Sequence, residues 1–129
     1  MEPKPTKDQV SASGKTTIAP EVLLTIARLT TLDVPGVSRM GNTPSSANRL
    51  FKRQIGEGVR IDIQDDTVSA DIYVILSENV NIRDVSRTVQ GNVSRAITDM
   101  VGMRVGRVNV HIEDIDYPTE NEEDQTSEA

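Results

Sequence analysis

Apolar and polar residues alternate from Val59 to Leu76, and this alternation is the strongest pattern in the chain. Two runs with a period of two are separated by Asp65 and Asp66, which are typical of tight turns. The pattern predicts a β-hairpin with one apolar, buried face and one polar face open to solvent. The residues expected on the buried face are Val59, Ile61, Ile63, Val68, Ala70, Ile72, Val74 and Leu76.

Helical periodicity is found on both sides of the hairpin. The first expected helix runs from Pro20 to about Leu32, and proline suits its first turn because an N–H there would have no partner. The second is expected to begin after Asn81, a capping residue, and to end at Gly102. On its polar side three arginines recur at multiples of four residues and predict a basic stripe: Arg83, Arg87 and Arg95.

Shorter apolar runs predict the other strands. We expect a short strand at Thr16 to Ile18, an edge strand at Val37 to Met40, and a last strand within residues 103–116, where Val108, Val110 and Ile112 alternate with polar residues. The order β-α-β-β-β-α-β predicts an α+β fold. We expect a two-layer sandwich with both helices packed on one face of a mainly antiparallel sheet.

The ends of the chain and one internal segment lack these patterns. Residues 1–14 and the acidic tail at residues 117–129 are expected to be disordered, which leaves one domain at residues 15–116. Residues 41–58 form a long connection, with a helical turn expected near residues 47–52. Its basic cluster, which is Arg49, Lys52 and Arg53, could meet an acidic partner, although a solvated loop is the favoured interpretation.

Composition narrows the possible chemistry. The chain has no cysteine, which excludes disulfides and thiolate metal ligands, and its aromatic content of 2% leaves few platforms on which nucleic-acid bases could stack. No stretch approaches the roughly 20 apolar residues that a membrane-spanning helix needs. We therefore expect a soluble, cytoplasmic protein.

His111 is the only histidine, and alternation places it on the open face of the sheet near Asp71, Tyr73 or Glu113. General acid–base catalysis or metal binding would require further groups that the sequence does not supply, so a surface histidine is favoured. The acidic residues of the hairpin lack the spacing of a calcium loop, and residues 56–58 lack the lysine of a phosphate-binding loop. We expect no enzyme activity, no cofactor and no metal site.

Two hypotheses of function remain. The first is a protein-interaction module that uses the open sheet face, where Tyr73, Ile75 and His111 are the candidate contact residues. The second is a small RNA-binding module that uses the face of the second helix with Arg83, Arg87 and Arg95. The low aromatic content and the acidic tail disfavour RNA binding.

Three stretches together resemble one known family. They are GKTTIAPEVLLTIARLTTLDVPGVSRM, VRIDIQDDTVSADIYVIL and VQGNVSRAITDMVGMRVGRVNVHIEDI, which are similar in order and spacing to the alkaline shock protein, or envelope stress response, family of bacteria. The resemblance covers about residues 14–116. It implies a non-enzymatic cytoplasmic protein that associates with itself and is held near the membrane by a membrane-anchored partner. It transfers no catalytic residues.

Overall fold

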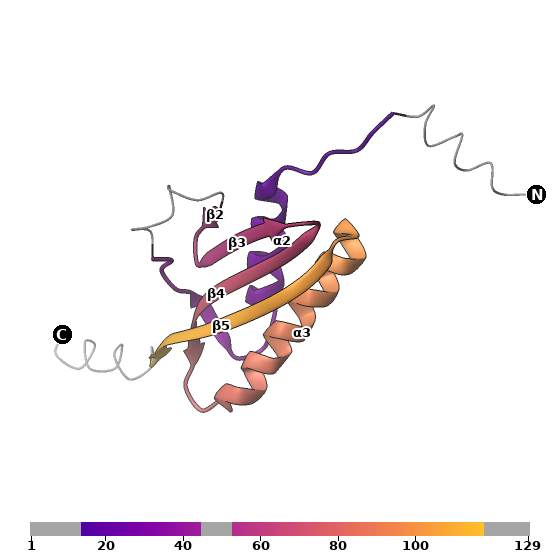
Figure 1. The fold of residues 1–129 in the computed structure, drawn as a ribbon. Coiled ribbons are helices and arrows are strands. Elements are labelled where there is room, and N and C mark those ends of the chain that lie inside the picture. Colours follow the sequence, from indigo (N-terminus) through magenta and orange to yellow (C-terminus); the bar gives the residue numbers. More distant parts are fainter. Residues whose placement is uncertain (1–13, 45–52, 118–129) are drawn as a thin grey trace, which may run out of the picture.

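The structure, a computed structural model, describes residues 14–44 and 53–117. Within these ranges the chain forms two layers (Figure 1), with a five-stranded sheet on one side and two helices on the other. The α+β fold class is therefore confirmed. The elements are α2 (Pro20–Leu32), β1 (Val37–Met40), β2 (Arg53–Gly56), β3 (Val59–Gln64), β4 (Thr67–Ser77), α3 (Ile82–Val101) and β5 (Arg104–Asp116).

Strand β4 is the centre of the sheet. On one side it pairs antiparallel with β3 along its first half and with β1 along its second half, and β2 pairs with the far side of β3. On its other side it pairs along its whole length with β5, and this pairing is parallel. Three of the four pairings are antiparallel, as expected from the sequence. The long helix α3 provides the crossover that a parallel pairing of β4 and β5 requires.

The predicted apolar face of the hairpin is the core. On β4 its residues are almost completely buried, with exposed fractions of 0–1% for Val68, Ala70, Ile72, Val74 and Leu76. Helix α2 packs Leu23, Ile26 and Ala27 against this face, and α3 packs Val89, Val93 and Ile97. The hydrophobic contacts between these faces hold the two layers together.

The ends of both helices follow from local chemistry. Helix α2 begins at Pro20 as expected, and Ala19 before it makes no side-chain cap. At the start of α3 the side-chain oxygen of Asn81 accepts a 3.0 Å hydrogen bond from the backbone N–H of Asp84, which confirms the predicted cap. Gly102 ends α3 with a φ of 79°, a left-handed conformation that favours glycine.

The turn between β3 and β4 has an unusual backbone. Asp65 and Asp66 both have positive φ angles, 52° and 64°, as the mirror-image turns of two-residue hairpins require. These turns match the right-handed twist of the flanking strands, which explains why the hairpin closes at this point. The predicted turn is confirmed, although it places two non-glycine residues in a costly conformation.

Two predictions about strands were wrong. Residues 16–18 do not form a strand, because this segment is exposed and pairs with no described strand; the side chain of Ile18 is 41% exposed. Conversely, the connection at residues 41–58 contains β2, which forms a hairpin with β3 through Glu57 and Gly58. Gly58 has a φ of 73°, so the glycine-containing stretch there serves as a turn. The helical turn expected near residues 47–52 and the expected disordered ends lie outside the described residues, apart from Gly14 and Tyr117.

Candidate functional site

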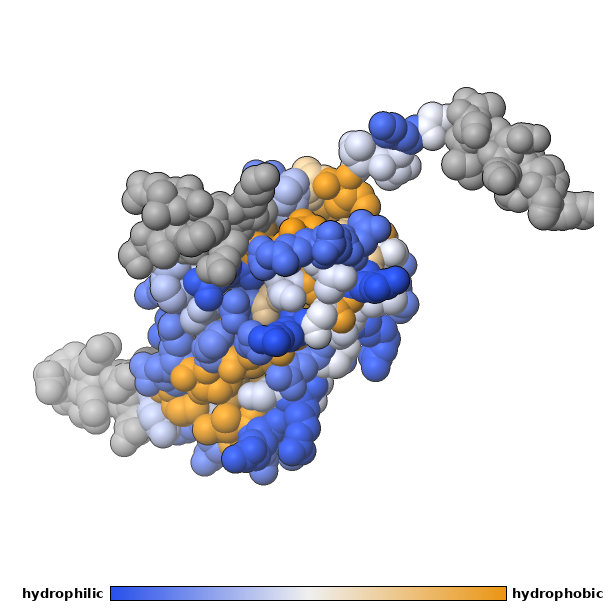
Figure 2. Space-filling view, viewed as in Figure 1, coloured by the Kyte–Doolittle hydropathy of each residue, from blue (hydrophilic) through white to orange (hydrophobic). Residues whose placement is uncertain are grey.

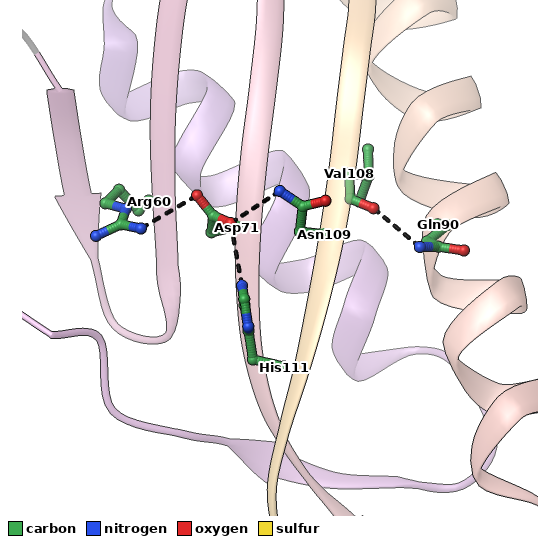
Figure 3. A network of polar contacts seen from close by, with 6 residues as sticks. All are labelled: Arg60, Asp71, Gln90, Val108, Asn109 and His111. Carbon is green, nitrogen blue, oxygen red and sulfur yellow. Dashed lines mark hydrogen bonds and ion pairs between the residues drawn. The ribbon is translucent and has the colours of Figure 1, made fainter.

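The outer face of the sheet, opposite the helices, carries a network centred on Asp71 of β4 (Figure 3). Its carboxylate accepts hydrogen bonds from Arg60 Nη2 at 3.3 Å and from Asn109 Nδ2 at 3.1 Å, and His111 Nε2 lies 3.0 Å from Oδ1. The strand register explains the network, because Arg60 of β3 and Asn109 of β5 lie directly opposite Asp71 on its two sides. One carboxylate thus connects three strands.

These contacts set the protonation state of Asp71. Partial burial raises the pKa of the Asp71 carboxyl. The hydrogen bonds from His111, Asn109 and Arg60, together with the charge of Arg60, outweigh this effect, so the pKa is lowered from its ordinary value. Asp71 is therefore ionised at neutral pH and its oxygens are occupied by donors. This arrangement stabilises the sheet and leaves the carboxylate poorly suited to act as a general base.

His111 lies where the alternation predicted it. Its ring stacks on Tyr73 with a centroid distance of 4.5 Å and an interplanar angle of 14°, while Nε2 faces Asp71. Both contacts follow from the register, since His111 is directly opposite Tyr73 on β4. The predicted neighbours Asp71 and Tyr73 are thus confirmed.

Two polar bridges cross β4 on the same face. Asp116 of β5 accepts a 2.7 Å hydrogen bond from Ser38 Oγ and forms an ion pair with Arg39 Nε at 3.3 Å. Nearby, Glu113 Oε1 accepts a 3.0 Å hydrogen bond from the backbone N–H of Asn42. The hydrogen bond from Ser38 has the largest effect and lowers the pKa of the Asp116 carboxyl; desolvation opposes it, and the contacts with Arg39 lower the pKa as well. These bridges tie β1 and the residues after it to β5.

The bridges correct one expectation about the open face. Tyr73 and Ile75 were expected to be exposed contact residues, but they are only 6% and 9% exposed. Tyr73 is covered by the ring of His111 and lies beside Gly41, and Ile75 lies opposite Arg39, whose side chain reaches across to Asp116. Contacts within this chain therefore bury both residues, and the prediction that their side chains form an interface is wrong.

The remaining outer face is hydrophilic and shallow. Figure 2 shows it mostly blue over the strands, with apolar areas interspersed. A hollow of about 330 Å³ is lined by Arg60, Asp62, Ser69, Asp71, Arg107 and Asn109. Within residues 14–44 and 53–117, no group of three or more histidine, cysteine, aspartate or glutamate side chains could hold a metal ion. Sequence reasoning missed Arg60, Asn109 and Arg107. The antiparallel register of β3 brings Arg60 to Asp71, and the parallel register of β5 brings Asn109 to Asp71 and Arg107 to the same hollow.

The predicted basic stripe lies on α3, where Arg83, Arg87 and Arg95 are all exposed. Arg87 Nη1 lies 3.9 Å from the carboxylate of Asp84 in an exposed ion pair, which is a weak interaction. The stripe is separate from the Asp71 network. With Tyr73 and Ile75 buried, it is the better candidate contact surface among the described residues.

The predicted basic cluster of the long connection is only partly described. Arg53 begins β2, where its backbone lies opposite Asp62 of β3. Arg49 and Lys52 lie outside the described residues. Their proposed contact with an acidic partner stays a prediction.

These features define a small α+β domain, with a sheet that two helices cover on one face and a polar network holds together on the other. The chain belongs to the alkaline shock protein 23 family, which has a cell envelope-related function, and the family model matches residues 8–117. The family resemblance noted in the sequence is thus confirmed. In the part of the chain that the structure describes, no helix is long and apolar enough to cross a membrane.

Relatives support this assignment. The chain is 34% identical to the Bacillus subtilis protein YqhY over 117 residues, which cover 89% of this chain and 87% of that protein. It is 36% identical to the Streptococcus pyogenes protein Spy1535 over 103 residues, or 79% of each chain. Among solved structures, one of the MamM CTD aligns with a TM-score of 0.48 and 14% identity over 74% of this chain and 98% of that one.

Proposed function

We propose that this protein is a non-enzymatic scaffold or adaptor of the envelope stress response type. In this role it associates with itself and docks from the cytoplasmic side onto a membrane-anchored protein partner. The observation that carries the proposal is membership of a family with a cell envelope-related function over residues 8–117. The family has a cell envelope-related function, yet the described residues contain no helix that could span a membrane. Both facts are consistent with a membrane contact made through another protein.

The chemistry of the outer face supports a contact role over a catalytic one. Asp71, the most enclosed acidic side chain of the network, is fully engaged by Arg60, Asn109 and His111. A catalytic site usually holds a polarised group that is available to substrate. Here the polar groups bind one another, and their effect is to stiffen the surface that a partner would meet.

The arginine face of α3 is the proposed docking surface for the membrane-anchored partner. Arg83, Arg87 and Arg95 are exposed on one long, rigid helix, and a partner segment rich in acidic residues would complement them. The same face is what an RNA-binding module would use, since arginines can contact phosphates. That alternative is tested alongside the first.

In-cell crosslinking followed by membrane fractionation tests the proposal. We expect crosslinked species that contain a second copy of the chain and a membrane protein, and we expect the second species to be lost when the three arginines are replaced by glutamate. A matched control replaces Arg28 of α2, which lies outside the stripe. Recovery of neither species would contradict the scaffold. Salt-dependent RNA binding that is lost in the same triple variant would favour the alternative.

A further inference from the structure

Strand β5 is a long edge strand of 13 residues, and β4 is its only partner among the described strands. On its other side no described strand pairs with its backbone groups. Figure 3 shows Gln90 of α3 reaching the carbonyl of Val108 on the side away from β4, with its Nε2 at 3.0 Å from the oxygen. Backbone groups alternate along a strand, so Val110 and Ile112 direct their N–H and C=O groups the same way as Val108.

The apolar residues of β5 are less well covered than their neighbours in the sheet. Val108, Val110 and Ile112 align with Ala70, Ile72 and Val74 of β4, which are at most 1% exposed, yet all three β5 residues are only half-buried. The core is therefore incomplete along this edge. A further strand beside β5 would cover the apolar row and pair the backbone groups.

The charges of β5 indicate which strand fits. Its first part carries Arg104 and Arg107, and its last part carries Glu113, Asp114 and Asp116. When the strand is paired antiparallel with itself about Val110, Arg107 faces Glu113 of the second copy and Arg104 faces Asp116. Opposite charges then meet at symmetric positions, which is the pattern that a two-fold interface requires.

The irregularities of the strand follow this symmetry only approximately. Gly106 and Glu113 are skipped in the pairing with β4, so a bulge lies on each side of Val110 at a similar distance. The exposed and half-buried positions of residues 105–115 also read the same in both directions. Val108 faces Ile112 of the second copy in this register, so apolar residues meet apolar residues on the helix side of the sheet.

We propose that two copies of this chain pair through the β5 edges, antiparallel and with Val110 at the two-fold axis. The proposal rests on the self-association in the proposed function and names the surface that produces it. Arg104 and Arg107 form no ion pair with any residue of the described ranges, so their charges are available to the second copy. Their proposed partners Glu113 and Asp116 already accept bonds across β4 through Oε1 and Oδ2, so the second copy would meet the other oxygen of each carboxylate. The carbonyl oxygen of Val108 has two lone pairs. It can therefore accept a hydrogen bond from the backbone N–H of Ile112 of the second copy, either beside the bond from Gln90 or in its place.

A proline at position 110 tests the pairing of the edges. Val110→Pro removes an N–H that points away from β4, so the bonds between β4 and β5 stay in place. The two-fold axis doubles the loss, and we expect self-association in sedimentation velocity to weaken by about tenfold or more. The control is Val110→Ala, which keeps the N–H, and thermal unfolding verifies that both variants are folded.

A charge exchange tests the register. Arg107→Glu and Glu113→Arg each place like charges opposite one another, and we expect each variant alone to associate weakly. An equimolar mixture of the two restores both opposite-charge pairs, so we expect it to form heterodimers. Arg28→Glu on α2, outside both proposed surfaces, is the matched control and should associate like the unchanged protein.

The outcomes separate the two proposals. If the unchanged chain associates but neither the proline nor the charge exchange alters its association, the β5 edge is not the interface and self-association stands. If the unchanged chain is monomeric throughout and crosslinks to no second copy in cells, self-association itself fails. Recovery of association in the mixture alone, with both single variants weakened, supports the β5 pairing.

Discussion

The two faces of β4 are stabilised in different ways. On the helix side, its residues are almost completely buried under α2 and α3, and their contacts are apolar. On the other side none of the described helices covers the strand, and burial of Tyr73 and Ile75 depends on polar bridges and on the stacked ring of His111. The inner face thus provides most of the stability, while the outer face fixes how the strands are aligned.

The largest expected effect is on the inner face. Ile72→Ala removes a side chain with no exposed surface and should lower the free energy of unfolding by about 2–5 kcal/mol, because it leaves a cavity in the core. The control is Ser69→Ala on the outer face of the same strand, which should change it by less than about 0.5 kcal/mol. Urea denaturation measures both. Equal losses would contradict the difference between the faces.

A smaller effect is expected from the outer network. Asp71→Asn keeps the shape of the side chain but removes the charge that Arg60, Asn109 and His111 contact, and should cost about 1–2 kcal/mol. Asp62→Asn, nearby on the same face, is the matched control and should be close to neutral. The same denaturation experiment applies. A neutral Asp71→Asn variant would show that the network does not stabilise the sheet.

The contribution of Asp71 should depend on pH. Its pKa is lowered in the folded protein, so the unfolded chain binds the proton more readily, and the stabilisation is complete above the unfolded pKa of about 3.9. It is lost as the pH falls through the lower, folded pKa. The difference in unfolding free energy between the unchanged protein and Asp71→Asn should therefore shrink in acid. Asp116 titrates in both proteins, so its contribution cancels in the difference. A difference that grows in acid would contradict a lowered pKa of Asp71 in the folded protein.

The smallest expected effect is at the turn between the faces. Asp66→Gly should raise the free energy of unfolding by about 0.5 kcal/mol, because glycine adopts the φ of 64° without the strain of a side chain. Gln64→Gly, within β3, should lower it by about 0.5–1 kcal/mol. Thermal unfolding of the two variants measures the contrast. A loss in both would show that the turn conformation carries no strain.

The same contrast explains what the sequence could predict. The inner face follows from period-two alternation and from the helical period of α2 and α3, because burial on one side leaves a regular pattern in the chain. The first turn of α3 was also predictable, since Asn81 and Asp84 are close in sequence. These features are local or periodic, and the structure confirms them.

The outer face could not be predicted to the same extent. Asn109 and His111 reach Asp71 only because β5 lies parallel to β4 in one register, which depends on contacts between residues distant in sequence. Arg60 reaches it across the β3–β4 hairpin. The burial of Ile75 likewise requires Arg39 and Asp116 to meet across the strand. Alternation assigned these residues to the correct face but could not show which of them other side chains would cover.

Sedimentation velocity of the full chain across micromolar concentrations tests the central claim most directly. If the protein is a scaffold that works through contacts with itself and a partner, its average sedimentation coefficient should rise with concentration toward that of a dimer or larger assembly. The increase should be smaller for Val110→Pro than for Val110→Ala. A coefficient that stays at the monomer value at every concentration would contradict the account.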